Sequence, residues 1–165
     1  MKSLCIALAV VCAGFVLADT TVAQTNAFSE TTSTARKADA QQSVQPEYKG
    51  RPGSPLSESV RVGQMLYLSG QLGTDAAGKL AAGGVKAETK QVMDNIRAIL
   101  ERNNSGMDRV VKCTVMLLDI ADRPAMNEVY ASYFPKDRMP ARSTFGTTGL
   151  ALGARVEIEC MATVK

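Results

Sequence analysis

The sequence offers few side chains that could carry out acid–base or nucleophilic chemistry, because it contains no histidine. A Ser-His-Asp triad, a Cys-His dyad and an HExxH zinc site are therefore excluded. Any general base must be a carboxylate, a lysine, a cysteine, a tyrosine or a water molecule. The chemistry to look for is one that needs no imidazole.

Arg142, in the segment Pro140–Ala141–Arg142–Ser143, is a candidate for binding an anion. A guanidinium group can hold a carboxylate through two parallel hydrogen bonds, whereas an ammonium group acts as a point charge. The segment lies between the second predicted helix and the last predicted strand, and we expect a loop there. From the residue alone, an ordinary surface arginine is an open alternative.

Two other patterns argue against a nucleotide or nucleic-acid ligand. The segment Gly73–Lys79 matches the GxxxxGK pattern of a phosphate-binding loop, but Leu80 follows where Ser or Thr would hold magnesium. We therefore interpret it as a glycine-rich loop. The formal net charge of +3 is small, and no basic stripe with interleaved aromatic residues is present.

Residues 1–18 are typical of a secretory signal peptide, with Lys2 at the start, an apolar stretch and a small-x-Ala site ending at Ala18. A second cleavage site could end at Ala23. The apolar stretch is shorter than the roughly 20 residues of a membrane anchor. Residues 19–46 are rich in Thr, Ser, Ala and Gln, which predicts a disordered linker. We expect an exported protein, periplasmic or secreted, with no membrane contact after cleavage.

Two cysteines, Cys113 and Cys160, remain after cleavage, and both lie in apolar β-prone stretches. We expect them on neighbouring strands or in the same core. In an oxidising compartment they could pair. The interpretation we favour from sequence is two buried free thiols that act as small apolar side chains.

The periodicity of apolar residues from 47 to 165 predicts an α+β domain. Its elements are a hairpin of strands 57–62 and 65–70, a helix at 87–104, a strand at 110–118, a helix at 122–134 and a strand at 155–164. Two helices can cover only one face of such a sheet. On the last strand Glu157, Glu159 and Met161 would share the other face, which a partner subunit could line.

Five blocks together resemble the RidA family, also called the YjgF type. They are Tyr67-Leu68-Ser69-Gly70-Gln71, Lys112-Cys113-Thr114-Val115, Met126-Asn127-Glu128-Val129-Tyr130, Met139-Pro140-Ala141-Arg142-Ser143 and Val156-Glu157-Ile158-Glu159. The resemblance covers residues 47–165. It implies a chorismate-mutase-like α+β fold, with a mixed sheet and two helices on one face, and a homotrimer with active sites between subunits.

The resemblance also implies an activity. Active members of the family hydrolyse 2-enamine and 2-imine acids to 2-keto acids and ammonia, with no metal and no organic cofactor. The alternative is a non-catalytic ligand-binding or interaction protein of the same fold, because fold does not fix function.

Site residues follow from the same resemblance. Arg142 would bind the substrate carboxylate and Glu157 would orient the attacking water. Many active members carry a tyrosine where this chain has Leu56, so we expect Leu56 to alter substrate preference. The remaining substrate-binding positions are Ser69, Gly70, Asn127 and Thr144.

Overall fold

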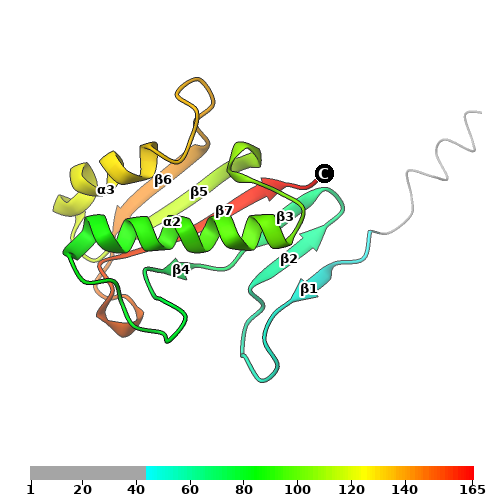
Figure 1. Ribbon diagram of the computed structural model, residues 1–165, viewed down its shortest axis with the longest axis horizontal. Coiled ribbons are helices and arrows are strands. Elements are labelled where there is room, and N and C mark those ends of the chain that lie inside the picture. The colour runs from blue at the N-terminus through cyan, green and yellow to red at the C-terminus, as the bar shows by residue number, and fades with distance from the viewer. Residues whose placement is uncertain (1–43) are drawn as a thin grey trace, which may run out of the picture. The chain divides into compact units, whose positions relative to one another are not determined.

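The computed structural model describes residues 44–165, which form one unit. The predicted signal peptide and nearly all of the predicted linker lie outside the described residues. Within the described part of the chain, no helix combines the length and the apolar character needed to cross a bilayer. Figure 1 shows a single curved sheet with helices against one of its faces.

The sheet has seven strands among the described residues, in the order β1-β2-β3-β7-β5-β6, with the short β4 also paired to β7. All pairs are antiparallel except β5 with β6. The strands are β1 (Glu47–Lys49), β2 (Ser59–Val62), β3 (Met65–Leu68), β4 (Gln71–Leu72), β5 (Val110–Leu117), β6 (Ala141–Gly146) and β7 (Val156–Thr163).

The predicted hairpin is confirmed as β2 and β3, with Val62 opposite Met65. Gly63 in the connecting turn has a φ of 58°, a conformation that glycine adopts without a Cβ clash. The segment after the hairpin is a loop, as predicted. The Asp75 carboxylate accepts hydrogen bonds from the backbone N–H groups of Ala77 and Lys79, so these groups are satisfied within the loop.

Two α-helices of the described region, α2 (Gly84–Arg102) and α3 (Arg123–Ala131), cover the same face of the sheet (Figure 1). The predicted helix at 87–104 is confirmed as α2, and its apolar residues Val92, Ile96, Ile99 and Leu100 are all buried. α2 begins three residues before the predicted start at Ala87. Pro124 lies in the first turn of α3, where its missing N–H costs no hydrogen bond.

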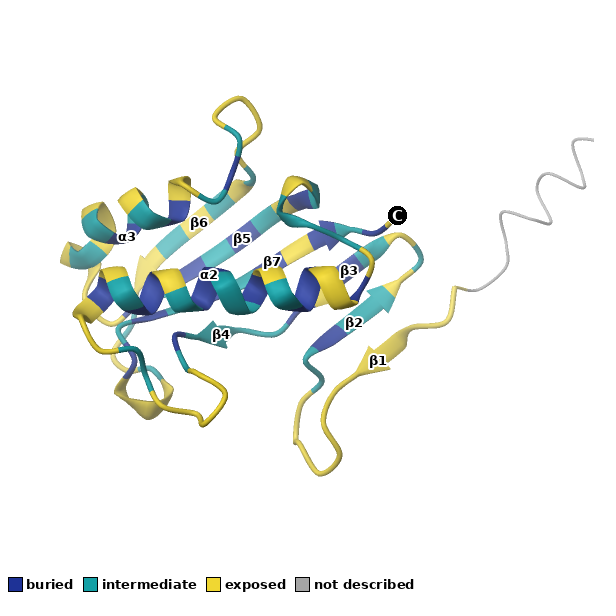
Figure 2. Cartoon of the chain, viewed as in Figure 1, coloured by how far each residue is buried: buried dark blue, intermediate teal, exposed yellow. Residues whose placement is uncertain are grey.

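Alternation along β7 separates the two faces as the sequence predicts. Side chains from Val156 to Ala162 at every second position are buried against the helices, whereas Glu157, Glu159 and Met161 lie on the open face. Figure 2 shows this alternation as bands of buried and less buried residues along the strands. Tyr67 and Phe145 are exposed on the open face too, as their register with Met161 and Met116 indicates.

The expectation of a loop around Pro140–Ser143 was wrong. Ala141–Gly146 forms β6, an edge strand parallel to β5. α3 is the crossover helix between these two parallel strands, a connection that parallel pairing requires. β6 pairs with β5, which lies far from it in the sequence. Because Pro140 and Arg142 lie at its start, the local sequence pattern did not predict a strand there. The short strands β1 and β4 were missed as well.

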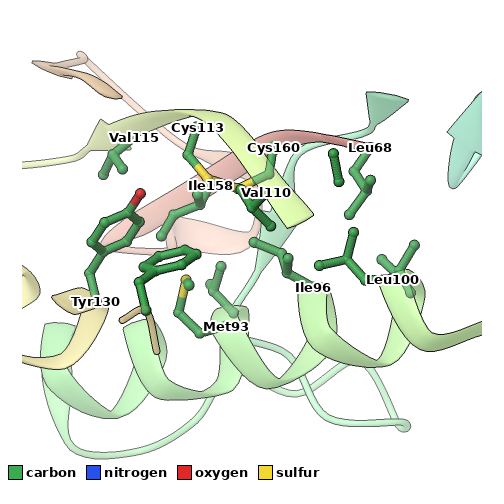
Figure 3. Packing of buried hydrophobic residues seen from close by; sticks show 14 of the residues in the cluster. Leu68, Met93, Ile96, Leu100, Val110, Cys113, Val115, Tyr130, Ile158 and Cys160 are labelled. Atoms are coloured by element: carbon green, nitrogen blue, oxygen red, sulfur yellow. A yellow bond between two sulfur atoms is a disulfide. The ribbon is translucent and has the colours of Figure 1, made fainter. Parts of the chain in front are cut away.

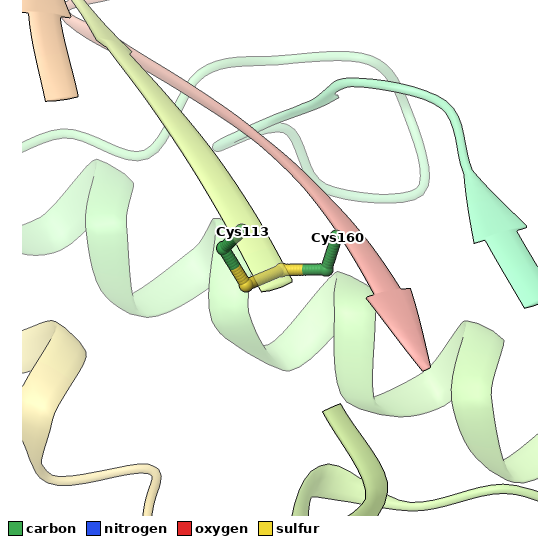
Figure 4. Close-up of a disulfide and its surroundings, with 2 residues drawn as sticks. All are labelled: Cys113 and Cys160. Atoms are coloured by element: carbon green, nitrogen blue, oxygen red, sulfur yellow. A yellow bond between two sulfur atoms is a disulfide. The ribbon is translucent and has the colours of Figure 1, made fainter. Parts of the chain in front are cut away.

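The favoured interpretation of Cys113 and Cys160 as free thiols was also wrong, because the two form a disulfide (Figure 4). They are direct partners on the antiparallel strands β5 and β7, and their Cα atoms are 4.1 Å apart. Both point to the helix-covered face, so the bridge lies inside the core (Figure 3). The predicted placement on neighbouring strands is confirmed.

Candidate active site

Arg142 lies on the edge strand β6 and points to the helix-covered face, because it is the register partner of buried Cys113. Its guanidinium carbon is 4.7 Å from the centre of the Tyr130 ring, which α3 supplies. This distance is within the range of a cation–π contact. The strand thus supplies the arginine, and the helix supplies the ring that lies against its guanidinium group.

The polar edge of that guanidinium is free within residues 44–165, where it makes no hydrogen bond and no ion pair. Arg155 is the useful contrast. Its Nε and Nη2 atoms donate to the Asp122 carboxylate at 2.9 and 2.6 Å, so its charge is already matched. Arg142 is therefore placed to bind an anion, and Arg155 is placed to join β7 to the start of α3.

A cavity of about 270 Å³ opens beside Arg142. Its lining comprises Asn127, Tyr130, Ala131, Met139, Pro140 and Arg142. Around it, three buried side-chain atoms have no hydrogen-bond partner in the described part of the chain: Asn127 Oδ1, Tyr130 Oη and Thr144 Oγ1. Thr144 shares the face of Arg142, since it pairs with buried Val115. Asn127 lines the cavity, so a polar ligand bound there could donate to its amide oxygen, whereas the Tyr130 hydroxyl points toward Val115 in the core (Figure 3).

Glu157 lies in β7 on the opposite, open face of the sheet. Its pKa is raised above the ordinary value, first because partial burial disfavours the charged form and second because the Glu159 carboxylate repels it. A carboxylate with a raised pKa is a better proton acceptor when it is ionised. Glu157 therefore has the properties of a group that could orient a water molecule and take a proton from it.

Gly70 is what allows the Glu157 carboxylate to lie against the chain. A Cβ built on Gly70 would overlap Glu157 Oε1 and would lie 2.9 Å from Glu157 Cδ. The neighbouring Ser69 hydroxyl donates to the carbonyl oxygen of Ser57 at 2.6 Å, so it holds the strand in place. Of the predicted substrate-binding residues, Gly70 thus lies against Glu157, and Ser69 directly precedes Gly70 in the chain.

A larger surface cavity of about 530 Å³ adjoins this region. Gly70 and Leu56 both line it, together with the segments around Arg51 and Asp75. Leu56 is 58% exposed, so it contributes to the wall of the cavity and little to the core. That a change at Leu56 alters substrate preference stays a prediction.

Within one chain, however, the two groups of predicted site residues are separated. Arg142, Asn127 and Thr144 belong to the helix-covered side, whereas Glu157, Gly70 and Ser69 surround the open side. Arg142 and Glu157 are two strands and three residues apart in register, or roughly 14 Å between Cα atoms from ordinary strand spacing and rise. Their side chains also point to opposite faces, so one small substrate cannot contact both in one subunit.

The sequence pointed to Tyr130 only as part of the family block Met126–Tyr130, within the predicted helix at 122–134. Its contact with Arg142 depends on the parallel pairing of β6, which the sequence did not reveal. The block Met126–Tyr130 carried the family resemblance, but no local signal distinguishes a core tyrosine from one that supports a guanidinium.

Comparison with known proteins identifies the family. The family model described as endoribonuclease L-PSP matches residues 49–164. The chain belongs to this family. The predicted RidA or YjgF membership is confirmed, and so is the predicted chorismate-mutase-like α+β fold with two helices on one face of a mixed sheet.

Relatives within the family are similar over most of residues 44–165. A goat (Capra hircus) protein named 2-iminobutanoate/2-iminopropanoate deaminase is 46% identical over 109 residues, which are 66% of this chain and 79% of that protein. The Arabidopsis thaliana protein named Reactive Intermediate Deaminase A, chloroplastic, is 41% identical over 111 residues. That match covers 67% of this chain and 59% of the plant protein.

A solved structure supports the same assignment. The crystal structure of RidA from an Antarctic Psychrobacter is 34% identical to this chain and aligns with a TM-score of 0.65. The alignment covers 75% of this chain and 100% of that one. The family architecture therefore accounts for the whole described sheet and its two helices.

Proposed function

We propose that this protein hydrolyses reactive 2-imino and 2-enamino acids to 2-keto acids and ammonia. The observation that carries the proposal is Arg142, which lines a small cavity, has no hydrogen-bond partner among residues 44–165 and suits a substrate carboxylate. The goat relative, at 46% identity, is named for this activity.

The reaction can proceed with this chain's own groups. Arg142 holds the carboxylate and so fixes the position of the adjacent C=N carbon, which is already electrophilic in the iminium form. Glu157 orients a water molecule, whose oxygen adds to that carbon while one water proton passes to the Glu157 carboxylate. Glu157 then gives this proton to the nitrogen. The C–N bond breaks and the C=O bond forms as the hydroxyl group passes its proton back to Glu157, and the released ammonia takes that proton and leaves as ammonium. Positioning alone can supply several kcal/mol toward such a step.

The separation of Arg142 and Glu157 favours a homotrimer in which each active site combines two subunits. Arg142, Asn127 and Thr144 of one subunit would meet Glu157, Gly70 and Ser69 of its neighbour. The open sheet face supports such an assembly, because Tyr67, Phe145 and Met161 are between 37% and 48% exposed there in the single chain. Apolar side chains gathered on one face favour burial against another subunit.

A second candidate function is non-catalytic ligand binding, and Leu56 is the observation that favours it. The residue lines the cavity beside Gly70, at the position where the family resemblance led us to expect a tyrosine. A pocket that keeps Arg142 but lacks this hydroxyl could bind a keto acid without turning over an imine.

Export to an oxidising compartment is also part of the proposal. Its support is the Cys113–Cys160 disulfide, a bond that persists in periplasmic and secreted proteins and is rare in the cytosol. The intact mass of the protein recovered outside the cytoplasm tests it: a chain that begins at Asp19 or Gln24 is expected, and a chain that retains residues 1–18 there contradicts it.

A coupled assay tests the catalytic proposal. An amino-acid oxidase generates the imine in place, and semicarbazide traps whatever imine remains. The expected result is faster ammonia release and less trapped imine with the protein present. Binding of pyruvate without any acceleration would favour the non-catalytic alternative.

A further inference from the structure

Arg142 contacts the Tyr130 ring but makes no hydrogen bond and no ion pair among residues 44–165. The guanidinium carbon of Arg142 lies over the face of the Tyr130 ring, 4.7 Å from the ring centre. The five N–H donors of an arginine lie in the plane of that group and point away from its faces. A carboxylate that approaches in this plane can take two donors while the ring contact stays in place.

Tyr130 is also a rigid support. Only 1% of its surface is exposed, and its ring centre is 4.9 Å from that of Phe134. Figure 3 shows the side chain extending from α3 into the core, with its hydroxyl toward Val115 of β5. Arg142 is different, since it lies on an edge strand, is half-buried and has no polar partner between residues 44 and 165. Without the ring, its long side chain would have many conformations to lose when a ligand binds.

We propose that Tyr130 is a positioning residue for Arg142, an inference that rests on the proposed function of Arg142 as the carboxylate anchor. The ring holds the guanidinium so that its N–H edge faces the cavity lined by Asn127, Met139 and Pro140. Tyr130 acts through Arg142 and touches no reacting atom. Since the contact uses the face of the ring, the aromatic group carries the role and the hydroxyl does not.

The ionisation of Tyr130 is compatible with this role. Burial raises the pKa of Tyr130 to about 12, although the nearby Arg142 charge lowers it somewhat. The phenol therefore stays neutral at physiological pH and gives Arg142 no counter-charge. The guanidinium keeps its full charge for a ligand. Because the hydroxyl is buried without a partner among the described residues, its removal should cost the fold little.

Two substitutions distinguish the contribution of the Tyr130 ring to pyruvate binding from that of its hydroxyl group. Tyr130→Phe keeps the ring, and we expect the Kd for pyruvate and the kcat/KM for imine hydrolysis to stay within about twofold of the wild type. Tyr130→Leu removes the ring, and we expect the pyruvate Kd to rise about 3- to 30-fold, the range that corresponds to a cation–π contact. Calorimetric titration with pyruvate gives Kd, and the coupled assay gives kcat and KM.

Phe134→Leu is the matched control for general damage to the core. It removes the ring that packs on Tyr130, but Phe134 makes no contact with the Arg142 guanidinium that the structure records. We expect it to lower thermal stability about as much as Tyr130→Leu while raising the pyruvate Kd clearly less, because the Tyr130 ring remains beside Arg142. Equal losses of pyruvate binding in both leucine variants would overturn the inference.

A double-mutant cycle tests whether Tyr130 affects pyruvate binding through Arg142. In an Arg142→Ala background, Tyr130→Leu should add less than a twofold further change to pyruvate binding, because the group it positions is gone. Binding of pyruvamide, which lacks the charged carboxylate, should be insensitive to Tyr130→Leu in the protein with Arg142 intact. Independent, multiplicative losses, or an equal loss for pyruvamide, would overturn the positioning role.

The outcome also distinguishes this inference from the proposed function. If the wild type binds pyruvate but hydrolyses no imine, the deaminase proposal fails, and the titrations still decide the role of Tyr130. If the wild type binds and hydrolyses while Tyr130→Leu behaves like the wild type, only the inference about Tyr130 fails. If the wild type binds no pyruvate, both are overturned.

Discussion

The Arg142 region and the Glu157 region of the same chain are built in contrasting ways. Arg142 is supported from one side by an aromatic ring, and its polar edge is left without a partner among residues 44–165. Glu157 is pressed against Gly70 and lies near the like-charged Glu159, which helps to raise its pKa. Each region thus carries a charged group that has no oppositely charged partner among the described residues. The contrast indicates two complementary halves of a site, which a second subunit brings together.

The largest effect should come from removing the positive half. Arg142→Ala should lower kcat/KM for imine hydrolysis by at least about 10- to 150-fold, the cost of a lost charged hydrogen bond, and should weaken pyruvate binding. The fold should survive, because Arg142 makes no hydrogen bond or ion pair between residues 44 and 165. Arg142→Lys should not restore activity, because an ammonium group cannot hold a carboxylate through two parallel hydrogen bonds as a guanidinium group does. Normal hydrolysis by Arg142→Ala would remove the basis of the proposed function.

Removing the negative half should give a different kinetic pattern. Glu157→Gln should reduce kcat by about 10- to 150-fold while leaving the Kd for pyruvate nearly intact, because the carboxylate acts in the chemical step. If the substitution weakened pyruvate binding and left kcat unchanged, Glu157 would be a binding residue and the contrast between the halves would be lost.

The stability of the Glu157→Gln variant tests whether the pKa of Glu157 is raised in the folded protein. The folded-state pKa of Glu157 is raised, first by burial and then by Glu159, so the ionised carboxylate is disfavoured in the fold. Protonation therefore stabilises the fold as the pH falls through the raised folded pKa toward the unfolded value. Glu157→Gln should accordingly be slightly more stable than the wild type at pH 7, and the difference should vanish in acid. Thermal melts across pH measure both.

An intermediate effect should follow from filling the space beside Glu157. Gly70→Ala places a methyl group where the Glu157 carboxylate lies, so the side chain must move while the backbone need not. Turnover should fall about tenfold or more, since small misplacements of catalytic groups are costly. Gly149→Ala is the control, because a Cβ there meets nothing within 4 Å. Equal turnover in the two variants would show that the close approach at Gly70 has no functional role.

The smallest effect concerns pH. Activity that needs ionised Glu157 should be lost as the pH falls through its raised pKa, above the ordinary value of about 4.3 for glutamate. Glu159→Gln removes one cause of the raised pKa, so the acid limb of the kcat profile should move to lower pH without a large change in its plateau. A limb that stays in place, or that moves upward, would assign the titration to another group.

The sequence predicted those features that depend on local periodicity. The β2–β3 hairpin, the apolar side of α2 and the placement of Glu157 on the open face all follow from residues close together in the chain. The strand β6 did not, because its pairing with β5 is long-range and parallel. The helix-covered position of Arg142 and its contact with Tyr130 were hidden for the same reason. The disulfide likewise depends on register between strands whose cysteines are 47 residues apart.

Mixing the two inactive variants tests the central claim, that Arg142 and Glu157 of different subunits form one site. Arg142→Ala and Glu157→Gln subunits are unfolded together at equal concentrations and refolded, and imine hydrolysis is measured by the coupled assay. In randomly mixed cyclic trimers about one quarter of the interfaces pair an intact Arg142 with an intact Glu157, so about one quarter of wild-type activity should return. A site formed within single chains would leave every site damaged, and activity no higher than that of the separate variants would contradict the account.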